Sequence, residues 1–207
     1  MSEGPAARHP WARLIRAERM VFYRAALPGM KPPANAPQGL EFRALAAEDF
    51  RRGAIFKEKD RAPQFERMLN AGHRCYGFVT AQGEAASYLW LSSPRYATPA
   101  ALFELGLSCR IAPGTVYIWD CRVHPDFRSR GLFREGLKRV MALGQLDGLT
   151  PAVIASEAGN DASNAAIMAA GFVADYSMTI LCFLGTFYLV AARGRIFVRG
   201  PGGMVDI

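Results

Sequence analysis

Residues 115–133, with the sequence TVYIWDCRVHPDFRSRGLF, combine residue types and spacing that suit phosphate binding. The first half is β-branched and aromatic, as in a buried strand, and Pro125 cannot donate to a strand ladder. Arg128, Arg130 and Gly131 then lead into a helical pattern. A loop that opens a helix presents unpaired backbone N–H groups at the positive end of the helix dipole. Arginines add charged donors and glycine permits close approach, so the segment predicts a pyrophosphate-binding turn.

This turn and a second pattern further along the chain resemble two signature motifs of one family. Residues 123–133 contain Val-x-Pro and then Arg-x-x-Gly, similar to motif A of the Gcn5-related N-acetyltransferases (GNAT). Residues 160–172 begin with Asn-x-x-Ser and end with Gly-Phe, similar to motif B of that family. The sequence departs from motif A at Phe133, where the family has a small residue. The resemblance covers about residues 39–198 and keeps the family's motif order.

The resemblance implies an α/β (α+β) fold with a mixed, largely antiparallel twisted sheet, helices on both faces, and a splayed central strand pair. The strands near Val123 and Ser156 would separate to admit the pantetheine arm of CoA. Residue patterns agree, because strand-like and helical runs alternate along the chain. Strands are predicted at residues 40–45, 75–80, 85–91, 116–124, 151–156, 172–183 and 186–198, and helices at 47–59, 62–71, 132–146 and 161–170. The proline-containing stretch 92–114 reads as a functional insertion holding a flap or a short strand.

The resemblance further implies acetyl-CoA as cosubstrate. The turn would hold the pyrophosphate, and the free strand edge near Cys121 and Val123 would pair with the pantetheine amides. The Val123 N–H would face the acetyl carbonyl and stabilise a tetrahedral intermediate. Asn160 suits cofactor contact and helix capping equally. The expected cofactor-binding residues are Cys121, Val123, Arg128, Ser129, Arg130, Gly131, Leu132, Phe133, Asn160 and Asn164.

Direct transfer to an amine needs a base for the incoming ammonium group, and two carboxylates are candidates. Asp120 is the acidic residue nearest Val123 in the sequence. A buried aspartate is costly unless it is paired, so the alternative for Asp120 is an ion pair with Arg122 or Arg110. Glu157, at the end of the next strand, is the second candidate, with a solvated strand end as its alternative.

The acid for the leaving thiolate is less clear from the sequence. Many family members carry a tyrosine where this chain has Ile167. Tyr176 is the candidate to replace it, with core packing as the alternative, and a CoA thiolate can also take its proton from solvent. A covalent route through Cys121 is unusual for the family.

Composition limits the class of protein. The 207 residues, of which 51% are hydrophobic, suit one well-packed domain. The net charge of +7 is concentrated in residues 1–31 and after Val190, so the near-neutral remainder argues against nucleic acid as a partner. The four cysteines and three histidines are scattered, which predicts free thiols and no structural metal.

The first 38 residues are expected to be a basic amphipathic helix followed by a proline-rich linker at residues 28–37, ahead of a GNAT-like domain at 39–207. Docking of that helix on the domain is favoured, and a peripheral membrane contact through residues 8–27 stays open. The N-terminus lacks the apolar core of a signal peptide. The uncharged run 176–192 is shorter than a membrane span and reads as a hairpin, so a cytoplasmic location is expected.

These observations lead to one main functional hypothesis. The chain is expected to be a GNAT-type N-acetyltransferase that moves acetyl from acetyl-CoA to a primary amine of a small-molecule or protein acceptor. The alternative is a non-catalytic acyl-CoA-binding module that acts on a partner or membrane surface through its N-terminal helix. The acceptor and a homodimeric state stay open.

Overall fold

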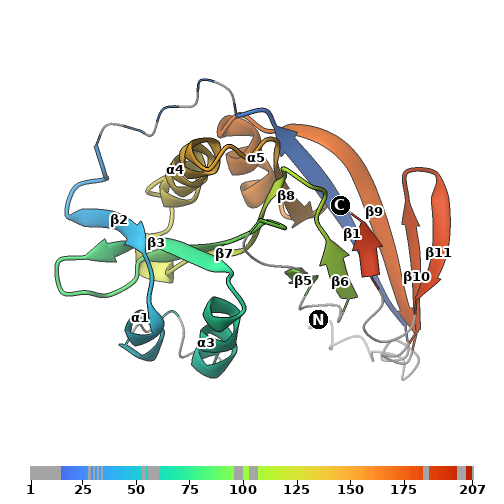
Figure 1. Cartoon of the computed structure of the whole chain (residues 1–207), viewed down its shortest axis with the longest axis horizontal. Coiled ribbons are helices and arrows are strands. Elements are labelled where there is room, and N and C mark those ends of the chain that lie inside the picture. Colours follow the sequence, from blue (N-terminus) through green and yellow to red (C-terminus); the bar gives the residue numbers. More distant parts are fainter. Residues whose placement is uncertain are drawn as a thin grey trace, which may run out of the picture.

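The computed structural model describes residues 15–27, 29, 31, 33, 35–52, 55, 61–95, 100–102, 107–183, 187–199 and 204–206. Over these residues the chain forms a nine-stranded sheet in the order β11-β10-β9-β1-β8-β7-β4-β3-β2 and a separate three-stranded sheet in the order β12-β6-β5 (Figure 1). In the large sheet β7 and β8 pair in parallel, and the other neighbours are antiparallel. Its strands are β1 (Ile15–Ala25), β2 (Leu40–Ala44), β3 (Arg74–Thr80), β4 (Ser87–Ser92), β7 (Val116–Val123), β8 (Ala152–Glu157), β9 (Val173–Phe183), β10 (Phe187–Ala192) and β11 (Arg195–Arg199).

Helices cover both faces of the large sheet (Figure 1). α1 (Ala47–Arg52) and α3 (Ala62–Asn70) lie on one face, where Phe50 and Phe65 pack with Trp90 and Tyr117. α4 (Leu132–Leu146) and α5 (Asp161–Ala169) lie on the other. Their inward side chains pack in a second core that includes Leu137, Val140, Met141, Ile118 and Ile154. The predicted mixed, largely antiparallel α/β fold is therefore confirmed.

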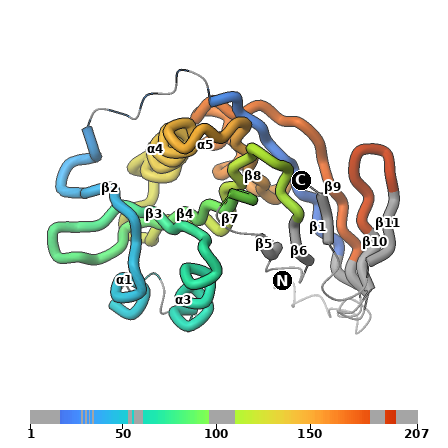
Figure 2. Tube along the Cα trace, viewed as in Figure 1, coloured from blue at the N-terminus to red at the C-terminus, as the bar shows by residue number. Residues whose placement is uncertain are grey.

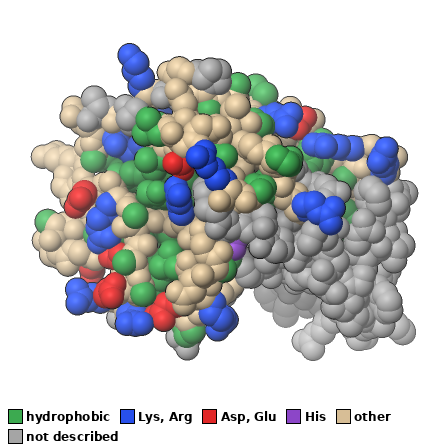
Figure 3. All heavy atoms as spheres, in the orientation of Figure 1, with side chains coloured by type: hydrophobic (Ala, Val, Ile, Leu, Met, Phe, Trp, Pro, Cys, Tyr) green, Lys and Arg blue, Asp and Glu red, His purple; other side chains and the backbone are tan. Residues whose placement is uncertain are grey.

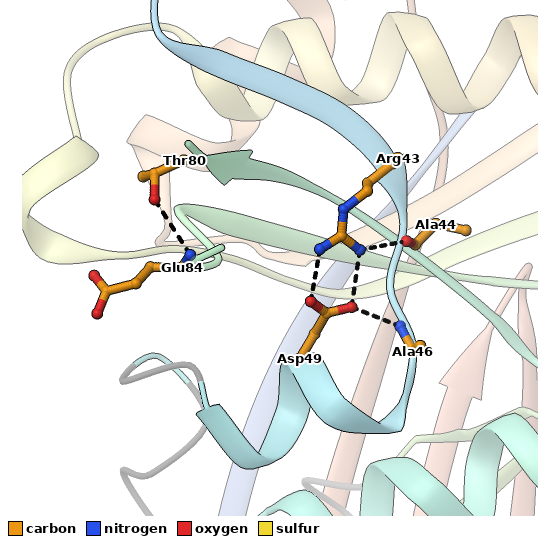
Figure 4. A network of polar contacts seen from close by, with 6 residues as sticks. All are labelled: Arg43, Ala44, Ala46, Asp49, Thr80 and Glu84. Carbon is orange, nitrogen blue, oxygen red and sulfur yellow. Dashed lines mark hydrogen bonds and ion pairs between the residues drawn. The ribbon is translucent and has the colours of Figure 1, made fainter. Parts of the chain in front are cut away.

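The first helix is fastened to the sheet edge by an ion pair (Figure 4). Arg43 of β2 donates through both terminal nitrogens to Asp49 of α1, at 2.9 and 2.7 Å. Asp49 also accepts the backbone N–H of Ala46 at 2.8 Å. The hydrogen bonds from Arg43 hold the pKa of the Asp49 carboxyl below its ordinary value. This contact fixes where α1 begins.

The helix predicted near the N-terminus is wrong over residues 15–25, which form β1. This strand lies inside the large sheet, paired with β8 on one edge and with β9 on the other (Figure 2). Phe22 is buried in the core under α1 and α3, and its neighbour Tyr23 is buried in the core under α4 and α5. Burial on alternating sides requires a strand, so tertiary pairing outweighs the helical spacing of the apolar residues. Residues 1–14 lie outside the described ranges.

The remaining elements follow the predictions with one difference, and the insertion forms short strands, which was one of its two predicted alternatives. The stretch predicted as one strand at 186–198 is divided, because Arg193 and Gly194 have positive φ angles of 51° and 70° and join β10 to β11 as a tight hairpin. The insertion at 92–114 contributes β5 (Ala100–Leu102) and β6 (Leu107–Arg110), and β6 pairs with β12 (Met204–Asp206). The helix predicted at 47–59 is described through residue 52 and at Ile55.

Strand β7 is irregular along both of its edges. The parallel ladder between β7 and β8 ends at the pair Ile118–Ile154, so the strands separate beyond it, as expected. On its other edge, β7 pairs with β4 through a register shift. Trp119 is opposite Trp90 and Arg122 is opposite Tyr88, which leaves two residues of β7 facing one of β4. This is a β-bulge, and it contains Asp120 with a φ of 41°.

Candidate active site

A cavity of about 280 Å³ lies where β7 and β8 separate. Its walls come from β1, β7, β8, the start of α4, the region of α5, and Arg61, which precedes α3. The lining residues are Glu18, Met20, Arg61, Tyr117, Trp119, Asp120, Cys121, Arg122, Phe133, Ile154, Ala155, Ser156, Glu157, Asn160, Ser163 and Ile167. The strand pair that the sequence analysis expected to admit pantetheine therefore borders an open space.

The cavity is bounded by side chains from both faces of the sheet. Because side chains alternate along a strand, the core contacts of β8 assign each lining residue to a face. Ile154 packs under α4 and α5, and Ser156 follows it two residues later. Ala155 packs in the core under α1 and α3, which puts Glu157 on that side. The space therefore connects the two faces. Apolar and small polar groups lie on the side of α4 and α5, and the other side, called the acidic side below, carries Glu157 and Asp120 together with Arg61.

β1 contributes to the acidic side. Met20 is opposite Glu157 in the ladder between β1 and β8, and Glu18, two residues earlier, lies on the same face of β1. Both β1 side chains line the cavity. The sequence analysis missed this contribution, because the helical reading gave Glu18 no neighbour on the central strands.

The segment predicted to bind phosphate forms an exposed turn before α4. A short 3-10 helix (Pro125–Phe127) ends β7, and Ser129 and Gly131 then take positive φ angles of 60° and 72°. Gly131 caps the start of α4, and Arg128, Ser129, Arg130 and Gly131 are all exposed. A Cβ atom on Gly131 would meet Arg134 Nη2 at 3.8 Å as its nearest contact, so the positive φ, and not lack of space, favours glycine.

Beyond this turn the chain enters the protein. Leu132 is buried, and Phe133 lines the cavity. The turn therefore lies outside the cavity, and the first turn of α4 contributes to the cavity wall. Phe133, which departs from the family motif, adds an aromatic side chain to the cavity lining.

Asp120 is held by two side chains at the bulge. Arg61 donates to its two carboxylate oxygens at 2.6 and 3.3 Å, and the Tyr88 hydroxyl donates at 3.3 Å. Arg61 also donates to the Tyr88 hydroxyl at 3.2 Å and lies over the Phe65 ring, 4.8 Å from its centroid. Burial raises the pKa of Tyr88, so this phenol stays protonated. The ion pair considered as the alternative for Asp120 exists, but with Arg61 in place of Arg122 or Arg110.

The two asparagines of the predicted motif B behave differently. Asn160 lines the cavity and also caps α5, accepting the backbone N–H of Ser163 at 3.2 Å. Asn164 is buried, and its amide donates to the carbonyl oxygens of Glu157 and Ala158 at 3.1 and 3.2 Å. Asn164 therefore fixes the backbone at the end of β8, where Glu157 lines the cavity.

Tyr176 is away from the cavity lining. Its ring stacks on Phe22 at 4.6 Å between centroids, and the Arg193 guanidinium lies 4.1 Å from the ring centroid. These contacts match the packing role considered for it in the sequence analysis. Cys121, in contrast, lines the cavity, and burial together with the nearby Asp120 charge raises the pKa of its thiol.

Trp119 forms a rigid part of the cavity wall. Its indole N–H donates to the Ser92 hydroxyl at 2.7 Å, and that hydroxyl is 2.6 Å from Nδ1 of His73. Burial lowers the pKa of His73. The three residues come from three different elements or their flanks, and no local motif in the sequence marks them.

Acidic and basic side chains are interspersed over α1 and α3 on the face shown in Figure 3. Within the described ranges, no three His, Cys, Asp or Glu side chains gather as metal ligands would. No helix in the same ranges is long and apolar enough to cross a membrane.

Residues 40–172 match the profile of the acetyltransferase (GNAT) family, so the chain belongs to this family. Members of the family typically use acyl-CoA. No curated protein matches the chain significantly.

Solved structures show the same fold at low identity. A putative GNAT acetyltransferase from Novosphingobium aromaticivorans aligns with a TM-score of 0.55 and 22% identity, covering 87% of this chain and 71% of the other. A GCN5-related N-acetyltransferase from Sphaerobacter thermophilus gives 0.53 and 15%, covering 93% and 55%. A Drosophila protein gives 0.57 and 16%, covering 83% and 52%. The chain thus spans little more than half the length of the last two proteins.

Proposed function

We propose that this chain is an N-acyltransferase that moves acetyl from acetyl-CoA directly to a primary amine. The observation that carries the proposal is the cavity between the separated strands β7 and β8, which connects the two sheet faces. One face bears the turn suited to pyrophosphate, and the other bears Glu18 and Glu157. A donor and an acceptor entering from opposite sides would meet at β7.

The CoA side is built mainly from backbone. The N–H groups at the start of α4, from Gly131 to Phe133, would bind the pyrophosphate, with Arg128 and Arg130 adding charge. Leu132 would anchor the helix start and Ser129 would shape the turn. Asn160 would contact the arm at the cavity wall, and Asn164 would support it from behind.

The open edge of β7 suits the pantetheine amides. The His124 N–H donates to Ala86 of the β4 side at 2.9 Å. Because N–H direction alternates along a strand, the Val123 and Cys121 N–H groups face the opposite edge, where the ladder with β8 has ended. These two groups would pair with the arm and with the acyl oxygen as charge develops on it.

Glu157 is the better candidate for the base. It lines the cavity on the acidic side, whereas both oxygens of Asp120 already accept hydrogen bonds from Arg61. The ammonium group first gives one proton to Glu157, directly or through water, and the free amine then attacks the acyl carbon to form the C–N bond. As the C–S bond breaks, the second nitrogen proton leaves to solvent and the thiolate takes a proton from solvent. The raised pKa of Cys121 disfavours an acyl-cysteine route.

The alternative, a non-catalytic module anchored by an N-terminal helix, loses support over residues 15–25. That segment is a strand with both edges paired, and it cannot lie on a membrane as a helix. A small-molecule or protein amine as acceptor and a homodimeric state stay predictions.

Calorimetry with acetyl-CoA tests the donor half of the proposal. Gly131→Glu places a carboxylate and a Cβ at a positive-φ position of the turn, and binding should weaken by at least about 100-fold. Gly83→Glu is the matched control, since Gly83 has a φ of +84° with open space around it. Equal binding by both variants would contradict the assigned turn, and no binding by the wild type would contradict the function.

Release of CoA thiol in the presence of a panel of primary amines tests the acceptor half. With the best amine, Glu157→Gln should lower kcat by about 100-fold while the acetyl-CoA Kd stays within about twofold. Glu84→Gln, in the turn between β3 and β4, is the control. An unchanged kcat in Glu157→Gln would remove Glu157 as the base.

A further inference from the structure

Asp120 has a backbone conformation that its position does not favour. Of the non-glycine residues with positive φ in the described chain, Ser129 and Arg193 lie in turns, and Asp120 lies within a strand. A left-handed backbone conformation is unfavourable for a residue other than glycine, although aspartate tolerates it better than most. Something in the structure must hold Asp120 in this state.

The bulge at Asp120 decides which groups of β7 face the cavity. Before it, Trp119 packs under α1 and α3 and Ile118 packs under α4 and α5. Asp120 follows Trp119 on the same face, where it meets Tyr88. From there the alternation is reset, and Cys121 packs toward α4 and α5. If Asp120 took a regular strand conformation, the alternation would continue without this reset, and the side chains and N–H groups of Cys121 and Val123 would point in the opposite directions.

Among the two side chains that bind Asp120, Arg61 makes the shorter contact and both of its terminal nitrogens donate to the carboxylate. The Arg61 and Asp120 side chains are only 16% and 18% exposed, and their closest approach is 2.6 Å. Arg61 is itself held by the Tyr88 hydroxyl and by the Phe65 ring. A planar guanidinium that meets both carboxylate oxygens fixes the orientation of the aspartate side chain and so restrains its backbone.

We propose that Arg61 is a positioning residue: by holding Asp120 in its left-handed conformation, it keeps the N–H groups of Cys121 and Val123 directed at the cavity. The kinetic part of this inference rests on the proposed function, while the conformational part does not. Asp120 then serves the backbone of β7 and takes no proton from the acceptor.

Substitutions at position 120 separate these two roles. Asp120→Gly removes the carboxylate, but glycine adopts positive φ without help. Asp120→Ala removes the same carboxylate and disfavours that φ. We expect Asp120→Ala to lower kcat by about 100-fold and Asp120→Gly by about tenfold or less, the scale that misplacement of reacting groups produces. A base would lose its function equally in both variants.

Arg61 substitutions complete the test. Arg61→Met should lower kcat by about 30-fold in the wild-type background and by less than about threefold in the Asp120→Gly background. Arg61→Lys should recover part of the loss, because it keeps the charge without the fork. The acetyl-CoA Kd should change by less than about threefold in Arg61→Met, since the turn at Gly131 is separate. Arg43→Met, which breaks a similar ion pair away from the cavity, should leave kcat unchanged.

An NMR measurement gives a readout that needs no turnover. The HN–Hα coupling of residue 120 reports its φ angle in the free protein. Arg61→Met should shift this coupling away from the left-handed value, and Asp120→Gly/Arg61→Met should keep the bulge, seen as an unchanged pattern of β4–β7 contacts. If the wild type turns over no acyl-CoA, the proposed function fails. The coupling still shows whether Arg61 holds Asp120 in its left-handed conformation. Retained positive φ in Arg61→Met, or equal loss of kcat in Asp120→Ala and Asp120→Gly, would overturn the proposal.

Discussion

Two arginine–aspartate pairs in this protein have nearly the same chemistry and different surroundings. Arg43–Asp49 joins an edge strand to the helix that follows it, six residues apart in the chain. Arg61–Asp120 joins residues 59 apart, and both of its members line the cavity. The first aspartate lies in the first turn of a helix, and the second lies at positive φ in a bulged strand.

The comparison shows that an ion pair has no fixed role of its own. Where both partners belong to adjacent local elements, the pair adds to the stability of their packing. Where one partner belongs to a strained strand that borders a cavity, the same pair controls the direction of backbone groups. Breaking the Arg43–Asp49 pair should therefore lower the free energy of unfolding, whereas breaking the Arg61–Asp120 pair should lower kcat.

Replacing each aspartate by asparagine gives the largest expected contrast. Asp120→Asn should lower kcat by about tenfold, because the charged fork is lost while asparagine still tolerates positive φ. Asp49→Asn should leave kcat unchanged and lower the free energy of unfolding by about 1.5–3 kcal/mol, the usual range for a hydrogen bond to a charged group. Steady-state kinetics and urea unfolding check both variants. An activity loss in Asp49→Asn as large as in Asp120→Asn would remove the distinction.

Acid should weaken the Arg43–Asp49 pair in a defined direction. Its hydrogen bonds hold the pKa of Asp49 below the ordinary value, so the folded protein binds fewer protons there than the unfolded chain. The stabilisation is complete above the unfolded pKa of about 3.9 and is lost as the pH falls through the lower folded value. The difference in unfolding free energy between wild type and Asp49→Asn should thus be constant near neutral pH and shrink below about pH 4. A difference that shrinks near neutral pH would point to another group.

The two pairs also differ in how far the sequence could predict them. The turn at Gly131, the helix after it and the cap at Asn160 depend on residues close together in the chain, and their predictions were confirmed as local structure. The separation of β7 from β8 joins more distant residues, and it was predicted from the resemblance to the family and not from local patterns. The pairing of Arg61 with Asp120 depends on how distant elements pack, and no periodicity marks it.

The N-terminal strand shows the same limit more strongly. Glu18, Met20 and Phe22 are spaced two apart, which fits a strand, but the apolar residues around them also fit one face of a helix. Only the open position between β8 and β9 decides between these readings, because a strand there satisfies two ladders of hydrogen bonds at once. That position is created by residues more than a hundred further along the chain, so the acidic side of the cavity could not be assembled from sequence alone.

Tyr88 offers the smallest and most selective test of the comparison, since it touches the Arg61–Asp120 pair and not the other. The hydrogen bonds of its hydroxyl with Arg61 and Asp120 are long, at 3.2 and 3.3 Å. Tyr88→Phe should therefore lower kcat only about two- to threefold and the free energy of unfolding by about 0.5–1 kcal/mol. Burial raises the pKa of the phenol, which therefore stays protonated throughout the working range. The shape of the pH–rate profile should then be the same in Tyr88→Phe and wild type. Loss of one limb of the profile in the variant would mean that Tyr88 transfers a proton. Arg61, Tyr88 and Asp120 would then take part in the reaction itself and would not act only by positioning the backbone of β7.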